Sequence, residues 1–537
     1  MSQNNHYIAI TIGPIGDMMG LVRKPTALWG ASYIFSYISK RLCELIVEKK
    51  VAAASSDIIT PFFVAEEDAK NENEKSLMDR RDGVGLFHDH IIVRADLSKN
   101  REVMKEIKRE VIENVASILA PENCDTPEKQ KAYADQIEKY ILIAVCGFEK
   151  DGTGNAIMYC GKQLDSLELP KQFAAAEEKH PILSRLQSRR DNDASATIKA
   201  IAERFGVDMK QWQLTLEKNS GRDVRDLPDI AAASRAPGFK KNKYYCILRA
   251  DGDNMSKIIS GLPDDEKCRE FSRICLDYCA KVAAAVKTYG GATIFAGGDD
   301  LFAIVPCQGV DPETGKMITV LEFTQSICKI FRASFRKEIE AIEKANLNQP
   351  ENKRVPVPSL SFGAYICYRK FPLYEAIERS GALLFGVAKN TAHKNCVAVH
   401  LQKHAGQSEE LVISNTVLAD ESNRFFERFN FLISNSKDQD EILLSASNKI
   451  LLFNHLLAAA PSENVKNVFE NVFDDDFHTD KRSDFLHVFL PDMYEICRKP
   501  DQIVLYERDR ALKTADPAKT LAQLIRFMKF FVEKGDM

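Results

Sequence analysis

The 537-residue sequence lacks any CxxC pair, although it contains 13 cysteines. This odd number of scattered cysteines, with no basic and apolar leader at the N-terminus, indicates reduced thiols in a cytoplasm. We therefore expect neither a disulfide partner nor a structural zinc site. Cys268, Cys275 and Cys279 share one helical face, and we interpret them as core residues because cysteine buries like a small hydrophobe.

Long apolar runs are also missing: none reaches the ~18 residues that a membrane span needs. The sequence has no GxxxxGK[ST] loop and no GxSxG elbow, which excludes the P-loop and serine-hydrolase motifs. Charge of one sign is absent too, with 73 Lys and Arg against 77 Asp and Glu. That balance neither requires nor excludes a nucleic-acid partner. At ~150 residues per domain, the length suggests three or four units.

Residues 1–150 have the pattern of one compact α+β unit. Apolar and β-branched runs predict strands at 7–13, 57–65, 83–95 and 139–148, and apolar residues at three- and four-residue spacing predict helices at 18–50 and 97–120. Strand, helix, two strands, helix, strand is the order of a ferredoxin-like unit.

A second compact unit is predicted at 241–405, after a polar, mostly helical insert and linker at 151–240. Its predicted elements again follow the ferredoxin-like order, with strands at 244–250, 293–306 (a hairpin), 359–368 and 395–401 and helices at 264–290, 317–345 and 372–389. Residues 406–537 are rich in helix formers, and we predict an all-helical C-terminal domain. The basic run Lys240, Lys241 and Lys243 is read as solvated surface, with RNA contact as the alternative.

The two units carry a short internal repeat. Residues 16–19, Gly-Asp-Met-Met, match residues 252–255, Gly-Asp-Asn-Met. In this alignment Ile15 takes the place of Asp251, and "RRDGVGLF" at 80–87 takes the place of "AGGDD" at 296–300. We infer that the first unit lost the acidic residues that the second unit kept.

The acidic residues of the second unit lie where its strands end. Asp251 and Asp253 follow the first strand, and Asp299 and Asp300 occupy the tip of the hairpin. Antiparallel pairing brings these positions together, and four neighbouring carboxylates repel one another unless cations bind between them. Two Mg²⁺ or Mn²⁺ ions, held by these aspartates and by substrate phosphates, meet that requirement. The alternative is a solvated Gly-Gly-Asp-Asp turn, since hairpin tips favour these residues.

Several other residues are candidates for nucleotide contact. The glycines have no side chain, so a nucleotide can approach their backbone closely; Lys257 and Lys389 could balance phosphate charge; Ser361 could line the pocket. These cofactor-binding candidates are Gly252, Asp253, Lys257, Gly297, Gly298, Ser361 and Lys389. The sequence "FHDH" at 87–90 also invites a metal-nuclease reading. Because His88 and His90 alternate along a predicted strand without a further His or Asp set nearby, we predict a structural role for them.

These motifs resemble a known family. "RADGDNM", "FAGGDDLFAIVP" and "SFGAYICYRKFPLYEAIERSGALLFGVAKN" are similar to the cyclase Palm domain of the large subunit of type III CRISPR effector complexes. "ITIGPIGDMMGLVRKPTALWGASYIFSYI" resembles the first, inactive Palm of the Cmr-type (III-B) branch. The resemblance covers roughly the first 405 residues by motif and the C-terminal domain by position.

The resemblance implies two Palm domains, a helical insert and a helical C-terminal domain. It implies a subunit of a guide-RNA complex in which target RNA activates the second Palm. That Palm then converts ATP to cyclic oligoadenylate, or to an AMP conjugate with a molecule such as S-adenosylmethionine. Asp251, Asp299 and Asp300 would hold the metals, with Asp253 a weaker match.

Two departures from the family shape the expectation. The sequence shows no HD nuclease domain before the first Palm, so we do not expect DNA cleavage. Cys146 and Cys160 are too isolated to reproduce the four-cysteine zinc site of many relatives. Two other functions stay open: a catalytically silent scaffold of the same ribonucleoprotein, and a stand-alone cyclic-dinucleotide synthase of the GGDEF type.

Overall fold

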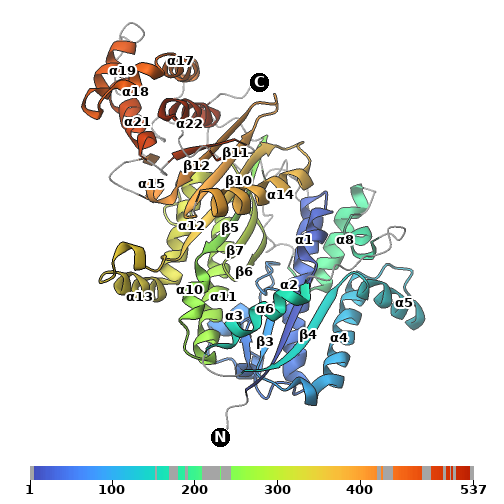
Figure 1. Cartoon of the computed structure of the whole chain (residues 1–537). Coiled ribbons are helices and arrows are strands. Elements are labelled where there is room, and N and C mark those ends of the chain that lie inside the picture. The colour runs from blue at the N-terminus through green and yellow to red at the C-terminus, as the bar shows by residue number, and fades with distance from the viewer. Residues whose placement is uncertain are drawn as a thin grey trace.

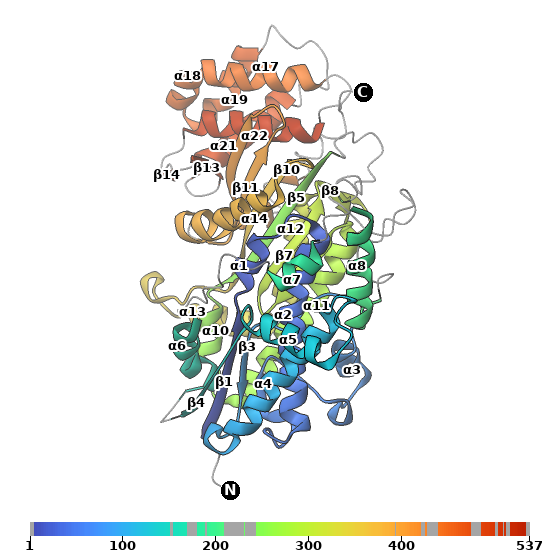
Figure 2. The same cartoon turned by 90° about the vertical axis from the view of Figure 1, so that its right-hand side faces the viewer.

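The computed structural model of the chain stacks three regions along one axis (Figure 1; Figure 2). The N-terminal sheet lies at one end, the larger sheet lies in the middle, and the helices of the C-terminal region lie at the other end. The structure describes residues 5–150, 154–168, 180–187, 191–208, 230, 243–392, 394–419, 425–426, 439–473, 485–499, 503–507, 510–511 and 516–532.

The first sheet has four antiparallel strands in the order β2-β3-β1-β4. These strands are β1 (His6–Gly13), β2 (Ile58–Thr60), β3 (His90–Val93) and β4 (Leu142–Glu149). The associated helices are α1 (Ile15–Gly20), α2 (Pro25–Glu48), α3 (Glu72–Met78), α4 (Leu97–Leu119) and α5 (Pro127–Glu138), with 3₁₀ turns η1 (Ser55–Asp57) and η2 (Glu66–Asp68). The order of strands and long helices agrees with the predicted ferredoxin-like arrangement.

Three predicted elements of the first unit differ from the structure. The single helix predicted at 18–50 is interrupted, because Pro25 has no N–H to donate and stands as the first residue of α2. The strands predicted at 57–65 and 83–95 are much shorter, as β2 and β3. Buried apolar residues at 84, 86 and 87 gave the longer prediction, but they pack as an irregular segment.

The second sheet contains the same four-strand order, β10-β5-β7-β6, within a larger eight-stranded sheet. These strands are β5 (Tyr244–Asp253), β6 (Ala292–Gly297), β7 (Asp300–Pro306) and β10 (Ser359–Tyr368). β11 (Cys396–Gln402) runs parallel to β10, and β8 (Gln308–Val310) and β9 (Met317–Thr319) form a separate hairpin. All the strands predicted here between 244 and 401 are present.

Helix α11 (Asp265–Tyr289) is the main helix of the second unit, and its ends are well specified. Asp264 caps its N-terminus by accepting from Lys267 N, and Gly290 ends it with φ 97°. The other helices are α10 (Met255–Ser260), α12 (Val320–Ser334), α13 (Arg336–Asn346), α14 (Leu373–Gly381) and the π-helix η4 (Ala382–Thr391), with a 3₁₀ turn η3 (Glu351–Lys353).

The two units pack through their first long helices. α11 packs on β2 of the first unit, while α2 packs on β6 of the second. Arg269 on α11 anchors this interface: its guanidinium donates to the carbonyls of Ile58 and Phe63 and lies 4.7 Å from the Phe62 ring centre. Asp265 accepts from Tyr7 (2.7 Å) and Arg94 (2.9 Å) in the same interface. Both units therefore contribute to one continuous buried region.

The C-terminal region is not all-helical, and that prediction is wrong. β12 (Ser408–Ser414) pairs with β11, β13 (Ile503–Glu507) pairs with β12, and β14 (Arg510–Ala511) completes the eight-stranded sheet. The helices are α15 (Asn415–Ala419), α17 (Gln439–Leu452), α18 (Asn454–Ala459), α19 (Val465–Phe473), η7 (Phe485–Phe489, a π-helix), α21 (Leu490–Arg498) and α22 (Pro517–Val532), with a 3₁₀ turn η5 (Ser462–Asn464). The sheet thus crosses the boundary expected near residue 405.

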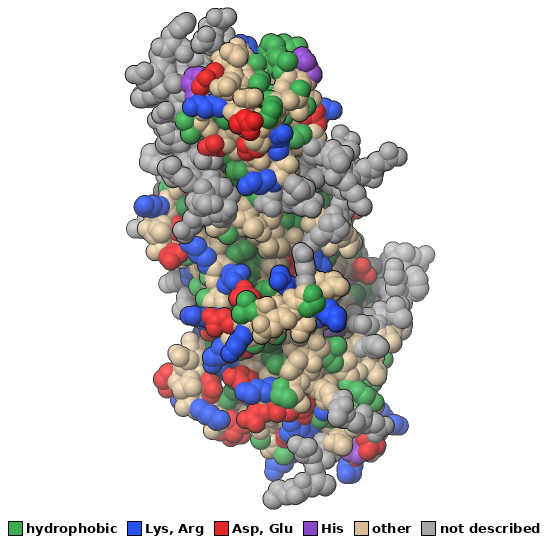
Figure 3. Space-filling view, turned by 60° about the vertical axis from the view of Figure 1, so that its left-hand side comes forward, with side chains coloured by type: hydrophobic (Ala, Val, Ile, Leu, Met, Phe, Trp, Pro, Cys, Tyr) green, Lys and Arg blue, Asp and Glu red, His purple; other side chains and the backbone are tan. Residues whose placement is uncertain are grey.

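The predicted insert contributes α6 (Ala156–Glu168), α7 (Pro181–Leu186) and α8 (Asp191–Arg204). Lys240 and Lys241 of the basic run lie outside the described residues. No helix in the described part of the chain is both long and apolar enough to cross a membrane. Acidic and basic side chains are interspersed over the face seen in Figure 3, which agrees with the small net charge.

Candidate functional site

The hairpin tip and the end of β5 meet at one edge of the second sheet. β7 lies between β5 and β6, with Ala250 opposite Leu301 and Gly297 opposite Asp300. This register places the next residue of β5, Asp251, opposite Asp300. This register agrees with the prediction that Asp251 lies near the hairpin tip, while the predicted role of these carboxylates stays a prediction.

Asp299 lies directly over Gly252. A Cβ atom added at Gly252 would collide with the Asp299 carboxylate and would lie 2.9 Å from the Asp299 Cβ. Burial of the Asp299 carboxyl and the negative charge of Asp251 raise its pKa to about 7. Gly252 is therefore required because the Asp299 side chain occupies the space that any larger residue would fill.

Asp300 begins β7 and is an exposed residue. Desolvation by neighbouring protein atoms raises the pKa of Asp300 well above its usual value, and the charges of Asp299 and Asp251 add to the effect. The ionised forms of these two adjacent carboxyl groups are unfavourable in the protein alone. A cation bound next to them would stabilise the ionised forms.

Lys389, at the end of η4, already provides one positive charge. Its Nζ lies 2.6 Å from Asp251 Oδ2 and donates to the carbonyl of Gly252 at 2.7 Å. The side chain is 16% exposed. Lys389 thus fixes the Asp251 carboxylate in place.

Asp253 does not join the other carboxylates in a shared cluster. It is fully buried, and its carboxylate accepts from Ser361 Oγ (2.8 Å), Ser359 Oγ (2.9 Å) and Asn395 N (3.0 Å). Lys389 Nζ lies 3.7 Å away. These bonds give Asp253 a structural role between β5 and β10, and its predicted part in metal binding stays a prediction. Ser361, predicted to line a pocket, instead holds Asp253.

The remaining carboxylates suit a small divalent cation. No group of three or more His, Cys, Asp or Glu side chains in the described residues is placed to hold a metal ion together. Mg²⁺ does not need one, because it binds through one or two carboxylates and takes its other ligands from water and phosphate. One or two of Asp251, Asp299 and Asp300 would meet this requirement, and a bound cation would lower the raised pKa values of Asp299 and Asp300.

The two hairpin glycines have different roles. Gly298 adopts φ 67°, a conformation that glycine reaches without strain, and the space around it is open. At Gly297 a Cβ would press against the Phe295 ring. Gly298 is thus the position where a ligand can approach the backbone, whereas Gly297 is required by packing. Lys257 lies exposed on α10, and its amine has no carboxylate partner among the described residues.

A cavity of about 280 Å³ borders the hairpin tip. Its walls come from both units and from α6 of the insert. They comprise Thr60, His88, Asp89, His90 and Ile92 of the first unit, Ile157, Gly161 and Leu164 of α6, and Met255, Ile259, Phe271, Ser272, Cys275, Gly297, Gly298, Asp299 and Asp300 of the second unit. The motif "FHDH" therefore lies at the candidate site, which the sequence analysis did not foresee.

The structure also corrects the register of the internal repeat. Gly13 ends β1 and lies opposite Leu142, the first residue of β4; Asp253 ends β5 and lies opposite Ser359, the first residue of β10. Gly13 thus corresponds to Asp253, and Thr11 corresponds to Asp251. The alignment that placed Ile15 at Asp251 was four residues out of register.

With this register, His88-Asp89-His90 takes the place of Gly298-Asp299-Asp300. Thr11 lies opposite His90, as Asp251 lies opposite Asp300. A matching contact supports the equivalence: Ser39 Oγ donates to the His88 carbonyl at 2.6 Å, and Cys279 Sγ donates to the Gly298 carbonyl at 3.4 Å. The segment "RRDGVGLF" at 80–87, which was predicted to match "AGGDD" at 296–300, ends just before His88. Asp89 and His90 therefore take the places of the paired carboxylates in the first unit, and His88 takes the place of Gly298.

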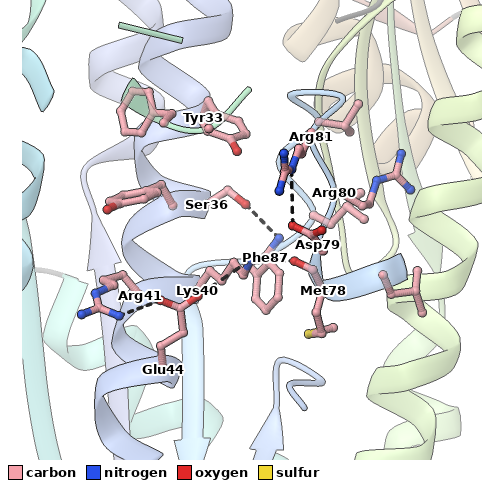
Figure 4. Close-up of a pocket in the computed structure, with 16 residues that line it drawn as sticks. Tyr33, Ser36, Lys40, Arg41, Glu44, Met78, Asp79, Arg80, Arg81 and Phe87 are labelled. Atoms are coloured by element: carbon pink, nitrogen blue, oxygen red, sulfur yellow. Dashed lines mark hydrogen bonds and ion pairs between the residues drawn. The ribbon is translucent and has the colours of Figure 1, made fainter. Parts of the chain in front are cut away.

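A larger cavity of about 370 Å³ lies between α2 and the segment after α3 (Figure 4). Its basic side chains already have partners: Arg41 contacts Glu44, Arg81 contacts Asp79, and Lys40 Nζ donates to the Met78 carbonyl. Arg80 likewise pairs with Asp82. Because these charges are neutralised within the protein, we place the candidate site at the hairpin rather than in this larger cavity.

Comparison with known proteins agrees with the strand and hairpin geometry. Residues 244–398 match the family model described as "Cas10/Cmr2, second palm domain", and residues 7–139 match "CRISPR-associated protein Cmr2, N-terminal". Together the two models cover just over half of the sequence. The chain belongs to the Cas10/Cmr2 family. The predicted family resemblance is therefore confirmed, and Asp251, Asp299 and Asp300 lie in the segment that matches the second palm domain.

Single relatives match this chain only in part or at low sequence identity. The CRISPR system Cmr subunit Cmr2 of Pyrococcus furiosus is 30% identical over 208 residues, which are 34% of this chain and 21% of that protein. The match thus spans about a fifth of the relative's length. Two solved structures share the Cas10/Cmr2 fold at 12% identity. The Csm1-Csm4 cassette in complex with cA4 has a TM-score of 0.52 (99% of this chain, 70% of that chain), and the apo type III-B Cmr-beta complex has 0.51 (98% and 82%).

Proposed function

We propose that the chain is a metal-dependent nucleotidyltransferase that acts on ATP as the large subunit of a type III CRISPR complex. The convergence of Asp251, Asp299 and Asp300 at one hairpin tip carries this proposal. One structural neighbour was solved with cA4 and another with pppApA. These ligands suggest cyclic oligoadenylate as the product, with an AMP conjugate such as that of S-adenosylmethionine as the alternative.

Each residue of the candidate site would have a separate role in the reaction. Asp251, Asp299 and Asp300 would hold one or two Mg²⁺ or Mn²⁺ ions. Bound there, the ions would neutralise the triphosphate and stabilise the charge of the leaving pyrophosphate. Gly298 leaves room for the nucleotide backbone to approach, and Lys389 keeps Asp251 oriented. The apolar walls of the 280 Å³ cavity would exclude water around the base.

We also propose the domain assignment. Residues 1–150 form a degenerate Palm, 151–240 a mostly helical insert, and the segment from 241 the Palm with the Gly-Gly-Asp-Asp hairpin. The predicted limit at 405 moves beyond 414, because β12 belongs to the same sheet. Other subunits of a Cmr-type complex, guide RNA and target RNA remain the proposed partners. Two structural neighbours are a Csm1-Csm4 cassette and a type III-B Cmr-beta structure.

The proposal is tested by pyrophosphate release from purified complex supplied with ATP, Mg²⁺ or Mn²⁺ and target RNA. Asp299→Asn combined with Asp300→Asn preserves the shape of the tip and should reduce the rate at least ~100-fold, because electrostatic stabilisation of phosphoryl transfer is lost. Asp277→Asn, on the surface of α11, is the matched control. Equal release by wild type and the double variant would refute the proposal.

One observation favours a second candidate, a catalytically silent scaffold. The amine of Lys389 sits 2.6 Å from Asp251, where it competes with a cation for this carboxylate. In a scaffold, Lys389→Met would leave assembly unchanged, and neither protein would release pyrophosphate from ATP. In the enzyme, the same change would weaken ATP binding. Measuring both on the assembled complex separates the two functions.

A further inference from the structure

Three side chains at the polar end of the 280 Å³ cavity form a hydrogen-bond chain across the two units. Thr60 Oγ1 lies 2.9 Å from His88 Nε2, and Ser272 Oγ lies 3.3 Å from Thr60 Oγ1. The backbone N–H of His90 donates to His88 Nδ1 at 3.3 Å. Thr60, His88 and Ser272 all line the cavity, whose other walls are largely apolar.

The position of the His88 proton follows from these contacts. Nδ1 accepts a hydrogen bond from an N–H, so it carries no proton. Burial, with the neighbouring His90, lowers the pKa of His88 to about 3, and the ring is neutral at physiological pH. The single ring proton is therefore on Nε2, which donates to Thr60 Oγ1.

A proton count shows what this end of the cavity offers to a ligand. Thr60 and Ser272 have one hydroxyl proton each, and the bond between them uses only one of the two. Thr60 already accepts from His88, so His88 cannot take the second proton. Whether Thr60 or Ser272 is the donor in the hydrogen bond between them, the other hydroxyl keeps a proton that it can donate to a ligand. The polar end of the cavity is thus a net hydrogen-bond donor.

We propose that Thr60 and Ser272 read the nucleobase of the substrate through an unprotonated ring nitrogen, with His88 as the positioning residue that fixes the direction of the hydrogen bonds. The inference rests on the proposed nucleotidyltransferase function. Adenine presents ring nitrogen N1 as an acceptor on its pairing edge, whereas guanine presents N1–H as a donor. The cavity volume is close to the lower end of the ~300–1,000 Å³ range of small-molecule pockets and suits one nucleoside.

The arrangement also explains how the degenerate unit takes part in the site. Thr60 and His88 belong to the first unit, and Ser272 belongs to α11 of the second. The first unit thus supplies the base-reading groups that define the ligand, while the second supplies the carboxylates. A base bound here would lie against both units at once.

The test measures binding of ATP and of its 1-deaza, 3-deaza and 7-deaza analogues to the assembled complex with Ca²⁺ in place of Mg²⁺. Wild type should bind one deaza analogue roughly tenfold more weakly than ATP, as expected for one lost hydrogen bond of about 1.4 kcal/mol. Thr60→Val and Ser272→Ala should each weaken ATP binding by a similar factor and abolish the preference for ATP over that analogue.

His88 is tested by a pair of variants. His88→Gln retains an N–H donor and should keep the discrimination, whereas His88→Leu should lose it. Thr288→Val, at an exposed threonine of α11 outside the cavity, is the control that should change neither ATP binding nor the discrimination. Wild type that binds ATP and all three deaza analogues equally would overturn the inference, and so would variants that retain full discrimination. Wild type that binds no ATP and releases no pyrophosphate would instead refute the proposed function.

Discussion

The buried Asp253 offers a sharp test of which carboxylates bind metal and which hold the fold. Its carboxylate accepts from Ser359, Ser361 and the backbone of Asn395, and it joins three strands, β5, β10 and β11. Asp253→Ala leaves at least two enclosed donors, the Ser361 hydroxyl and the Asn395 amide, without an acceptor. At about 1–3 kcal/mol for each unsatisfied donor, the free energy of unfolding should fall by about 2–6 kcal/mol.

Lys389 does not add to this cost, because it remains paired with Asp251. Urea unfolding followed by circular dichroism, with and without Mg²⁺, measures the change. Asp253→Asn is the control: it keeps one oxygen for the Asn395 amide and should lose only about 1 kcal/mol. We expect the effect of Asp253→Ala to be the same at all Mg²⁺ concentrations. An Asp253→Ala protein as stable as wild type without Mg²⁺, but no longer stabilised by it, would show that Asp253 is a metal ligand.

Three further predictions concern neighbouring groups. Gly252→Ala forces a methyl group into the space of the Asp299 carboxylate, so pyrophosphate release should fall at least ~100-fold while Gly16→Ala, in open space, has no such effect. The pKa of Asp299 is raised to about 7 in the folded protein, against about 3.9 in the unfolded chain, so between these pH values only the folded protein keeps the proton. Without metal, the free energy of unfolding should therefore fall as the pH rises from about 4 to about 7, when compared with Asp299→Asn. A rise over this range would contradict the assignment. Arg94→Met removes a partner of the buried Asp265 and should lower the melting temperature by several degrees, corresponding to about 2 kcal/mol, whereas Arg101→Met on the exposed face of α4 should not.

Much of the fold could be predicted because its strands are strongly marked. The runs at 244–250, 293–306 and 359–368 are rich in β-branched and aromatic residues. The first and last lie in single, largely buried strands, and the middle run forms the two strands of the hairpin. The C-terminal strands were missed because "EELVIS" at 409–414 carries two glutamates that resemble a helix start. Its strand conformation depends on pairing with β11, a contact that local pattern does not contain.

In the candidate site too, local features could be predicted from the sequence, whereas features that depend on tertiary packing could not. Asp251 and the hairpin tip were predicted, since strand ends and turns are local features. The structural roles of Asp253 and Ser361 were not, because the hydrogen bonds from Ser359, Ser361 and Asn395 to the Asp253 carboxylate join segments distant in sequence. His88 and its neighbours were visible as a motif. Their place beside the hairpin follows only from the packing of α11 on the first sheet.

The pairing of β11 with β12 has a practical consequence for dividing the chain. Cleavage near residue 405 would strip β12 from β11 and expose an unpaired, apolar strand edge from Cys396 to Gln402. Such an edge pairs readily with another chain, so a truncated protein would tend to aggregate. The Asn415 side chain also reaches back to the carbonyl of Leu360, next to Ser361. Loss of activity after removal of the C-terminal region would therefore report a damaged sheet, and a fragment expressed for study should extend through β12 and α15.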